Sequence, residues 1–168
     1  GGYKNAKNRL NEFIEKGYSD YAQYRSDPSK RASSEMSPYF HFGQISTHEV
    51  FEKIVQHEGW SPEKINPSLA GRREGWWGGS FNMESFFDEL ITWRELGYHT
   101  CVRRANYNQY SSLPEWAIKT LHEHSSDERE HIYSLDQLTY SQTHDEIWNA
   151  AQNQLREQGV IQNYLRML

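Results

Sequence analysis

Apolar residues recur every three or four positions along most of this chain, and that period is typical of amphipathic helices. Residues 1–17 begin the pattern, with Ala6, Leu10, Phe13 and Ile14 on one face. The same period predicts further helices at residues 18–27, 46–57, 82–105, 114–126, 143–159 and 160–168. We therefore predict an all-α fold with several helices.

Polar side chains stand where these helices should begin. A capping box joins a hydroxyl at the start of a helix to an acid or amide three residues later. The pairs of this kind are Ser46 with Glu49, Ser134 with Gln137, and Thr143 with Glu146. Asn82 is the predicted cap of the long helix that ends near Ala105, and Gly159 suits the left-handed residue that closes a helix.

The two C-terminal stretches mix polar side chains with their apolar positions. An indole, several amides and a cation are interleaved there: Trp148, Asn149, Gln152, Asn153, Gln162, Asn163 and Arg166. Two adjacent helices of this composition could close around a flat polar ligand. An ordinary helical hairpin with its amides in water fits the same pattern.

Hydroxyl groups are concentrated before a proline in the first third of the chain. Ser33, Ser34 and Ser37 precede Pro38, which suits the first turn of a helix. Hydroxyls and free backbone N–H groups at a helix start can bind an anion. A plain serine N-cap is the alternative.

A carboxylate interrupts the apolar face of the long predicted helix. Glu89 lies between Phe86 and Trp93 at spacings of three and four. If Glu89 is buried there, it is a candidate proton donor or hydrogen-bond partner. A salt bridge with Arg94 or Lys53 is the alternative.

Composition limits both the size of the protein and its chemistry. The 168 residues fit one domain, but apolar residues make up only 36% of them and the mean hydropathy is −0.96. Aromatic residues reach 14%, so rings must supply much of the buried surface. This balance suits a module whose core is completed by a ligand or by another part of a longer chain. The net charge of −5 excludes a uniformly basic nucleic-acid surface, so a DNA contact requires a local cationic patch.

The sequence lacks the features of disulfide-bonded, membrane-spanning and metal-binding proteins, and this narrows the expected compartment and partners. The single cysteine, Cys101, excludes an internal disulfide, and its helical pattern predicts a buried thiol. We expect a reducing, cytoplasmic compartment, with nucleoid association in a bacterium. No apolar run approaches the roughly 18 residues of a membrane span, and no histidine–carboxylate spacing indicates a metal site. Neither a membrane nor a metal is expected as a partner.

Several motifs together resemble the flavin-binding helical domain of DNA photolyases and cryptochromes, most closely the class II cyclobutane-dimer photolyases. The N-terminal motifs are GG-x-x-x-A-x-x-x-L-x-x-F, Y-x-x-x-R and S-x-x-S-P-Y-x-H-F-G-x-I-S. The later motifs are FFDELITWREL, and THDEIWNAAQ followed by G-x-x-x-N-Y-L-R-M. The resemblance covers nearly all of residues 1–168.

The resemblance implies an FAD cofactor and a set of site residues. The residues that would touch the flavin dinucleotide are Tyr21, Ser33, Ser34, Met36, Ser37 and Phe86. Arg25 would bind a phosphate of either the flavin or DNA. Glu89 would hydrogen-bond the damaged pyrimidine pair, with Asn163 and Met167 lining that side. Trp148 matches one tryptophan of the relay that re-reduces the flavin.

The implied activity is that of a deoxyribodipyrimidine photo-lyase, a carbon–carbon lyase that acts on damaged DNA. In the family, light moves an electron from reduced FAD to a cyclobutane pyrimidine dimer flipped out of the duplex, and the dimer splits. Family members also have an α/β antenna domain upstream, and flavin contacts and relay tryptophans downstream. The resemblance therefore implies that residues 1–168 form the larger, N-terminal part of the flavin domain, incomplete at its C-terminal end and without the antenna domain. Alone, they should bind flavin weakly or not at all and repair nothing.

Two other functions fit the same residues. A cryptochrome-like photoreceptor would share the fold and FAD, but light would change its flavin redox state and its partners; Glu89 favours repair. A non-enzymatic helical interaction module that has lost the flavin fits the acidic charge and the polar composition.

Overall fold

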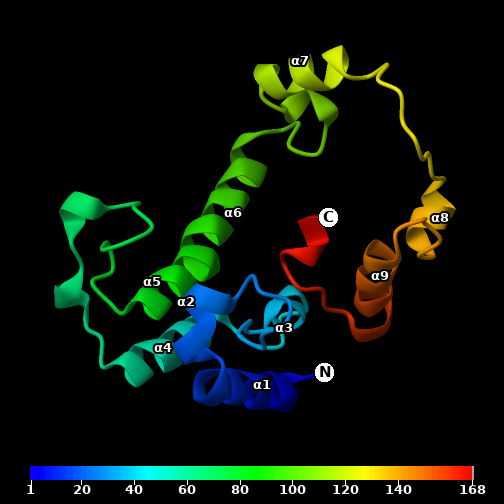
Figure 1. The fold of residues 1–168 in the computed structure, drawn as a ribbon. Coiled ribbons are helices and arrows are strands. Elements are labelled where there is room, and N and C mark those ends of the chain that lie inside the picture. The colour runs from blue at the N-terminus through cyan, green and yellow to red at the C-terminus, as the bar shows by residue number, and fades with distance from the viewer. Residues whose placement is uncertain (168) are drawn as a thin grey trace.

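Every regular element in the computed structural model, which describes residues 1–167, is helical (Figure 1). The α-helices are α1 (Tyr3–Lys16), α2 (Tyr21–Tyr24), α3 (Ser37–His41), α4 (Thr47–Glu58), α5 (Phe81–Phe87), α6 (Arg94–Arg103), α7 (Glu115–Glu123), α8 (Leu135–Thr139) and α9 (Glu146–Gln158). Short 3₁₀ turns lie between several of them, and no strand occurs within the described range. The all-α prediction is confirmed.

The hydrophobic core lies between α1, α2, α4 and α5, which we call the helical body. Phe13 on α1 is central to it: its ring centroid lies 5.8 Å from that of Tyr18, 5.7 Å from Tyr21 and 5.4 Å from Phe86. The other residues of the predicted face of α1 belong to the same cluster: Ala6, Leu10 and Ile14. Aromatic pairs therefore supply much of this core, as the composition predicted.

Helices α5 and α6 form one long rod, joined by a π-helical stretch at Asp88–Trp93. The rod begins at Ser80, whose hydroxyl accepts a backbone hydrogen bond from the first turn of α5. The prediction that Asn82 is the cap was wrong. The Asn82 side chain accepts a hydrogen bond from the Ala22 N–H at 2.8 Å and donates one to the Ser19 carbonyl at 2.9 Å. Asn82 therefore ties the rod to the start of α2 instead.

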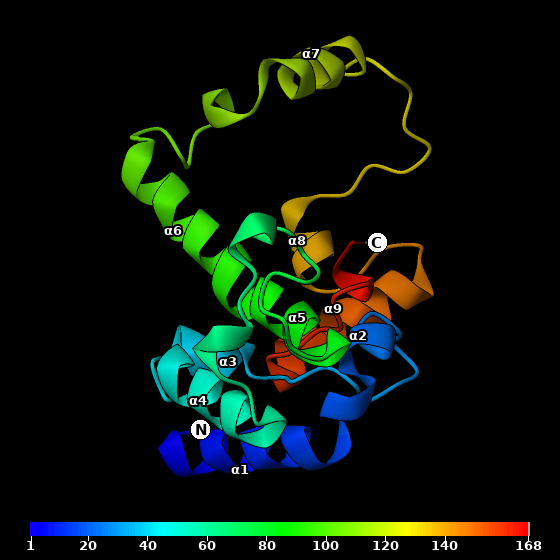
Figure 2. The same cartoon turned by 90° about the vertical axis from the view of Figure 1, so that its left-hand side faces the viewer.

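Residues 94–145, which we call the arm, leave the helical body. Helix α6 projects outward to α7, and a long loop returns to α8 and α9 (Figures 1 and 2). In the described chain no side chain between Leu90 and Ala151 is buried. The prediction that Cys101 is a buried thiol was wrong, because it lies on the projecting part of the rod and is exposed.

The last part of the chain is helical only in its first half. Helix α9 is capped by Asp145, whose Oδ1 accepts hydrogen bonds from the N–H groups of Ile147 at 2.8 Å and Trp148 at 3.0 Å. The predicted box of Thr143 with Glu146 was therefore wrong. Helix α9 ends at Gln158 and is closed by Gly159, which has the left-handed conformation, as predicted.

The helix predicted at 160–168 was also wrong. A 3₁₀ turn forms only at Leu165–Met167, and Leu168 lies outside the described residues. Gln162 gives the physical reason, because its Oε1 accepts hydrogen bonds from the N–H groups of Tyr164 at 2.6 Å and Leu165 at 3.4 Å. A side chain that binds nearby backbone N–H groups in this way competes with helix formation.

The remaining predicted caps are found at α8 and α4. The Ser134–Gln137 box is complete. Ser46 accepts from the Glu49 N–H at 3.0 Å, but the Glu49 carboxylate binds the Tyr3 hydroxyl at 2.8 Å and so links α4 to α1. Across residues 1–167, no helix has the length and apolar character needed to cross a membrane.

Candidate functional site

A pocket of about 1080 Å³ lies between the helical body and the C-terminal segment. Its walls come from α1, from residues 21–40, from the α5–α6 rod and from residues 154–166. This volume is slightly above the range of about 300–1,000 Å³ that is typical of ligand sites. It is lined by most of the residues that the sequence singled out: Tyr21, Arg25, Ser33, Ser34, Ser37, Phe86, Glu89 and Asn163.

The pocket lining is positively charged although the chain is acidic. In the described chain, seven Lys and Arg side chains line the pocket against three Glu side chains, while the whole sequence carries a net charge of −5. The serines at 33, 34 and 37 add hydroxyl groups to the same lining. A local excess of cations with hydroxyl donors beside them favours an anionic ligand.

Two buried rings form the apolar wall of the pocket. Tyr21 and Phe86 lie 5.2 Å apart in an edge-on arrangement, and Phe13 packs against both from the core. Burial raises the pKa of Tyr21, while the nearby Arg25 opposes this effect and Glu89 adds to it. The Tyr21 hydroxyl therefore stays protonated at neutral pH and available as a donor.

An ion pair joins the two sequence motifs that meet at this pocket. Arg25 Nη1 donates a hydrogen bond to Glu89 Oε1 at 2.7 Å, and the guanidinium lies 5.7 Å from the Tyr21 ring centroid. Burial lowers the pKa of Arg25, but Tyr21 and Glu89 outweigh it and raise that pKa above its ordinary value. Arg25 is therefore a permanent cation at the wall of the pocket.

The condition set for Glu89, burial on the apolar face of the rod, is not met. Its side chain is 42% exposed, and its salt-bridge partner is Arg25 rather than Arg94 or Lys53. Glu89 belongs to the π-helical stretch of the rod, a local helix form that is frequent at functional sites. Its carboxylate is accessible from the pocket and is also held in place.

Three residues proposed for the site do not line the pocket. Met36 is buried in the hydrophobic core, although the other members of residues 33–37, which we call the serine loop, line the pocket. Trp148 is half-buried on α9, and Met167 is 66% exposed in the final turn. The structure therefore gathers most of the flavin-side residues with Glu89 and Asn163, and leaves these three outside.

Two lining residues make contacts that the sequence did not predict: Arg9, and Gln162 from the polar C-terminal set named above. Arg9 Nε donates to the Ser34 carbonyl at 3.0 Å. Gln162 Nε2 donates to the Arg25 carbonyl at 2.8 Å across 137 residues. Within the described chain, this is the only hydrogen bond that joins residues 146–167 to the helical body. Neither contact has a sequence motif, because each depends on segments that are far apart along the chain.

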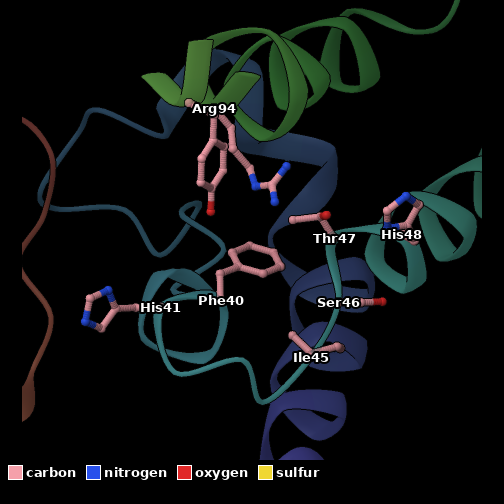
Figure 3. Close-up of a pocket in the computed structure, with 8 residues that line it drawn as sticks. Phe40, His41, Ile45, Ser46, Thr47, His48 and Arg94 are labelled. Atoms are coloured by element: carbon pink, nitrogen blue, oxygen red, sulfur yellow. The ribbon is translucent and has the colours of Figure 1, made fainter. Parts of the chain in front are cut away.

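A smaller pocket of about 370 Å³ lies beside the first, and Phe40 and Arg94 line both. Figure 3 shows that His41 and His48 point away from its centre. Arg94 is paired with the carboxylate of Glu95. The polar groups of this pocket therefore do not converge on one point. Within residues 1–167, no group of three or more His, Cys, Asp or Glu side chains could hold a metal ion.

The fold and the site define an all-α domain whose large pocket is lined by cations and walled by two aromatic rings. Comparisons with known proteins name the family. The chain is 33% identical over 158 residues to a deoxyribodipyrimidine photo-lyase of Potorous tridactylus, which covers 94% of this chain and 26% of that protein. It is 36% identical over 167 residues to a deoxyribodipyrimidine photo-lyase of Methanothermobacter thermautotrophicus, which covers 99% of this chain and 32% of that protein.

A shorter match adds the second branch of the family. A cryptochrome of Arabidopsis thaliana is 47% identical over 51 residues, which covers 30% of this chain and 8% of that protein. No family model matches the chain. The chain belongs to the photolyase and cryptochrome family, as its motifs indicated, and it spans about a quarter to a third of the length of the photolyases it matches.

Proposed function

We propose that this chain forms the FAD-binding face of a deoxyribodipyrimidine photolyase, which acts on pyrimidine dimers in damaged DNA. One observation carries the proposal: residues of the serine loop, α2, the rod and the C-terminal segment line a single pocket. The names of the relatives that match nearly the whole chain support the same activity.

The residues present fit the chemistry of a flavin dinucleotide. The cations and serine hydroxyls would hold the diphosphate, which requires positive charge and hydrogen-bond donors. The buried rings of Tyr21 and Phe86 offer an apolar wall to a ring system, and their position is fixed by Phe13 behind them. Reduced FAD, when bound, supplies under light the electron that splits the dimer.

The residues of this chain would place the lesion and control the charge around it. Glu89 would hydrogen-bond the pyrimidine dimer, and its exposed carboxylate is accessible for that contact. Arg25 keeps a permanent positive charge next to Glu89, where it would stabilise negative charge on the dimer or bind a phosphate. Asn163 lines the same pocket and would contact the lesion side.

A titration of the 168-residue chain with FAD, followed by flavin fluorescence, tests the binding site. We expect weak but saturable binding, and weaker binding in the Ser34→Ala and Ser37→Ala variants. Ser26→Ala is the matched control, because Ser26 is exposed on the same segment and does not line the pocket. Unchanged binding in Ser34→Ala and Ser37→Ala, or equal loss in all three variants, would contradict the site.

The activity is tested in a polypeptide of the relatives' full length that carries this segment. We expect light-dependent removal of cyclobutane dimers from DNA, and a rate reduced by about tenfold in Glu89→Gln with unchanged FAD content. Loss of FAD in that variant would assign Glu89 to cofactor binding instead.

A cryptochrome-like photoreceptor is the second candidate, supported by the 47% identity to the Arabidopsis cryptochrome over 51 residues. The same dimer-removal assay separates the two functions, because a photoreceptor would bind FAD and leave the dimers intact. A helical interaction module that has lost the flavin would neither bind FAD nor remove dimers.

A further inference from the structure

The loop that carries the pocket serines is held by a side chain from another helix. Arg9 on α1 donates through Nε to the Ser34 carbonyl at 3.0 Å. Its Nη1 lies 3.0 Å from Glu12 Oε2 and 3.5 Å from Glu35 Oε2. The guanidinium therefore binds the loop at two consecutive residues, once through the backbone and once through a carboxylate.

The residue at this contact has an unusual backbone conformation. Glu35 has a φ of +54°, in the left-handed region that side-chain-bearing residues rarely adopt. Such a conformation costs about 1–2 kcal/mol and persists only where surrounding contacts enforce it. Arg9 provides contacts on both sides of the peptide between Ser34 and Glu35. The next residue, Met36, fixes the other end of the turn by its burial in the core.

We propose that Arg9 is a positioning residue that holds the serine loop in its binding conformation at the pocket. This inference rests on the proposed FAD site. Arg9 lines the pocket, but its charge is shared with Glu12 and Glu35, so it acts through the loop rather than as a ligand-binding cation. A planar guanidinium can reach a carbonyl and two carboxylates at once, and a lysine ammonium lacks that fork.

The geometry gives two opposite expectations for the lysine variant. If Arg9 positions the loop, Arg9→Lys and Arg9→Gln should both weaken FAD binding by about tenfold, because each loses the Ser34 contact. If Arg9 instead binds the ligand as a cation, Arg9→Lys should keep most of the affinity. Lys7→Gln is the matched control, since Lys7 is a cation of the same helix that does not line the pocket.

The strained turn supplies a rescue experiment. Glycine adopts a positive φ without penalty, so Glu35→Gly should relieve the strain that Arg9 offsets. Added to Arg9→Gln, it should restore FAD affinity to within about threefold of the Glu35→Gly single variant. An equal loss with and without Glu35→Gly would overturn the positioning role.

Backbone hydrogen exchange in the ligand-free chain separates this inference from the proposed function. We expect faster exchange of the amides of residues 33–37 in Arg9→Gln, with residues 47–58 of α4 unchanged. Unchanged exchange in the loop would overturn the positioning role even if FAD binds. If Ser34→Ala and Ser37→Ala leave FAD binding unchanged, the proposed site fails, and the exchange result still decides whether Arg9 holds the loop.

Discussion

Arg25 and Glu89 are 64 residues apart in sequence and form a hydrogen-bonded ion pair, with Nη1 and Oε1 separated by 2.7 Å. Arg25 follows α2, and Glu89 belongs to the π-helical stretch of the rod. Through this pair, the segment that bears Tyr21 and Arg25 holds Glu89, the side chain proposed to bind the lesion. It therefore fixes two groups that must keep a constant separation for the proposed reaction.

A double-mutant cycle with Arg25→Gln and Glu89→Gln measures this pair. Because the two side chains are 22% and 42% exposed, we expect a coupling of about 0.5–1 kcal/mol in urea unfolding at low salt. At about 1 M salt the coupling should fall, because exposed charges are screened. The pair of Lys119 and Glu123 on α7, which is more exposed at 3.7 Å, should give a smaller coupling. Equal coupling for both pairs would contradict the structure.

Local patterns predicted the parts of the fold that depend on neighbours in sequence. The face of α1 and the box of Ser134 with Gln137 are set within one or two helical turns, and both were predicted. Asn82 shows the limit of this reasoning. An asparagine side chain suits an N-cap. The Asn82 amide instead hydrogen-bonds the Ala22 N–H and the Ser19 carbonyl, which no local pattern indicates.

The candidate site also contains both residues that the sequence predicted and contacts that it could not predict. Most of the site residues implied by motif resemblance do line the pocket, although they come from segments that are distant in sequence, because a motif carries a three-dimensional arrangement with it. The Gln162 and Arg9 contacts could not be predicted, since no spacing rule connects residues 25 and 162. The Arg25 partner of Glu89 could not be predicted either, because the two residues are 64 apart in sequence.

Gln162 should keep the C-terminal segment in place over the pocket. Gln162→Ala removes its hydrogen bond to the Arg25 carbonyl and its contacts to the turn that follows. We expect a loss of about 1 kcal/mol in local stability and faster amide exchange at residues 160–167. Gln158→Ala removes no hydrogen bond between this segment and α2 and is the control. Equal exchange in the two variants would show that packing alone holds the segment.

Cys101 should react readily with a thiol reagent, in contrast to the buried thiol that the helical pattern predicted. The residue is exposed on α6, in the arm. We expect one thiol to react with Ellman's reagent in the native chain as fast as in urea, within about a factor of five. Protection by a factor of a hundred or more would place α6 against another surface.

Alkaline pH should destabilise the chain through Tyr18. Burial raises the pKa of Tyr18 above its ordinary value, and the hydrogen bond from its hydroxyl to Glu58 adds to this effect. Above about pH 10 the unfolded chain releases this proton while the native chain retains it, so stability falls as the pH rises. Below that pH the contribution of Tyr18 is fully present.

Urea unfolding between about pH 8 and pH 11, a window that includes the phenol pKa of about 10 in the unfolded chain, measures how stability falls with pH. Tyr18→Phe should show a shallower fall in stability, because it has no phenolic proton to retain. Tyr107→Phe, which alters an exposed ring of the arm, should leave the slope unchanged. The same slope in Tyr18→Phe as in the wild type would remove Tyr18 as the cause.

Gly78 should be far less tolerant of a side chain than Gly43, although both have a positive φ, of +63° and +61°. A Cβ at Gly78 would lie 2.1 Å from the Lys64 carbonyl oxygen, whereas none of the surrounding atoms is within 4 Å of one at Gly43. Both alanine variants should lose about 1–2 kcal/mol from the left-handed backbone. Gly78→Ala should lose a further 1–3 kcal/mol or so, because two backbone segments must separate. That separation would also strain the hydrogen bond from Trp60 to the Trp77 carbonyl, so Gly78→Ala should change the tryptophan fluorescence of the folded chain and Gly43→Ala should not.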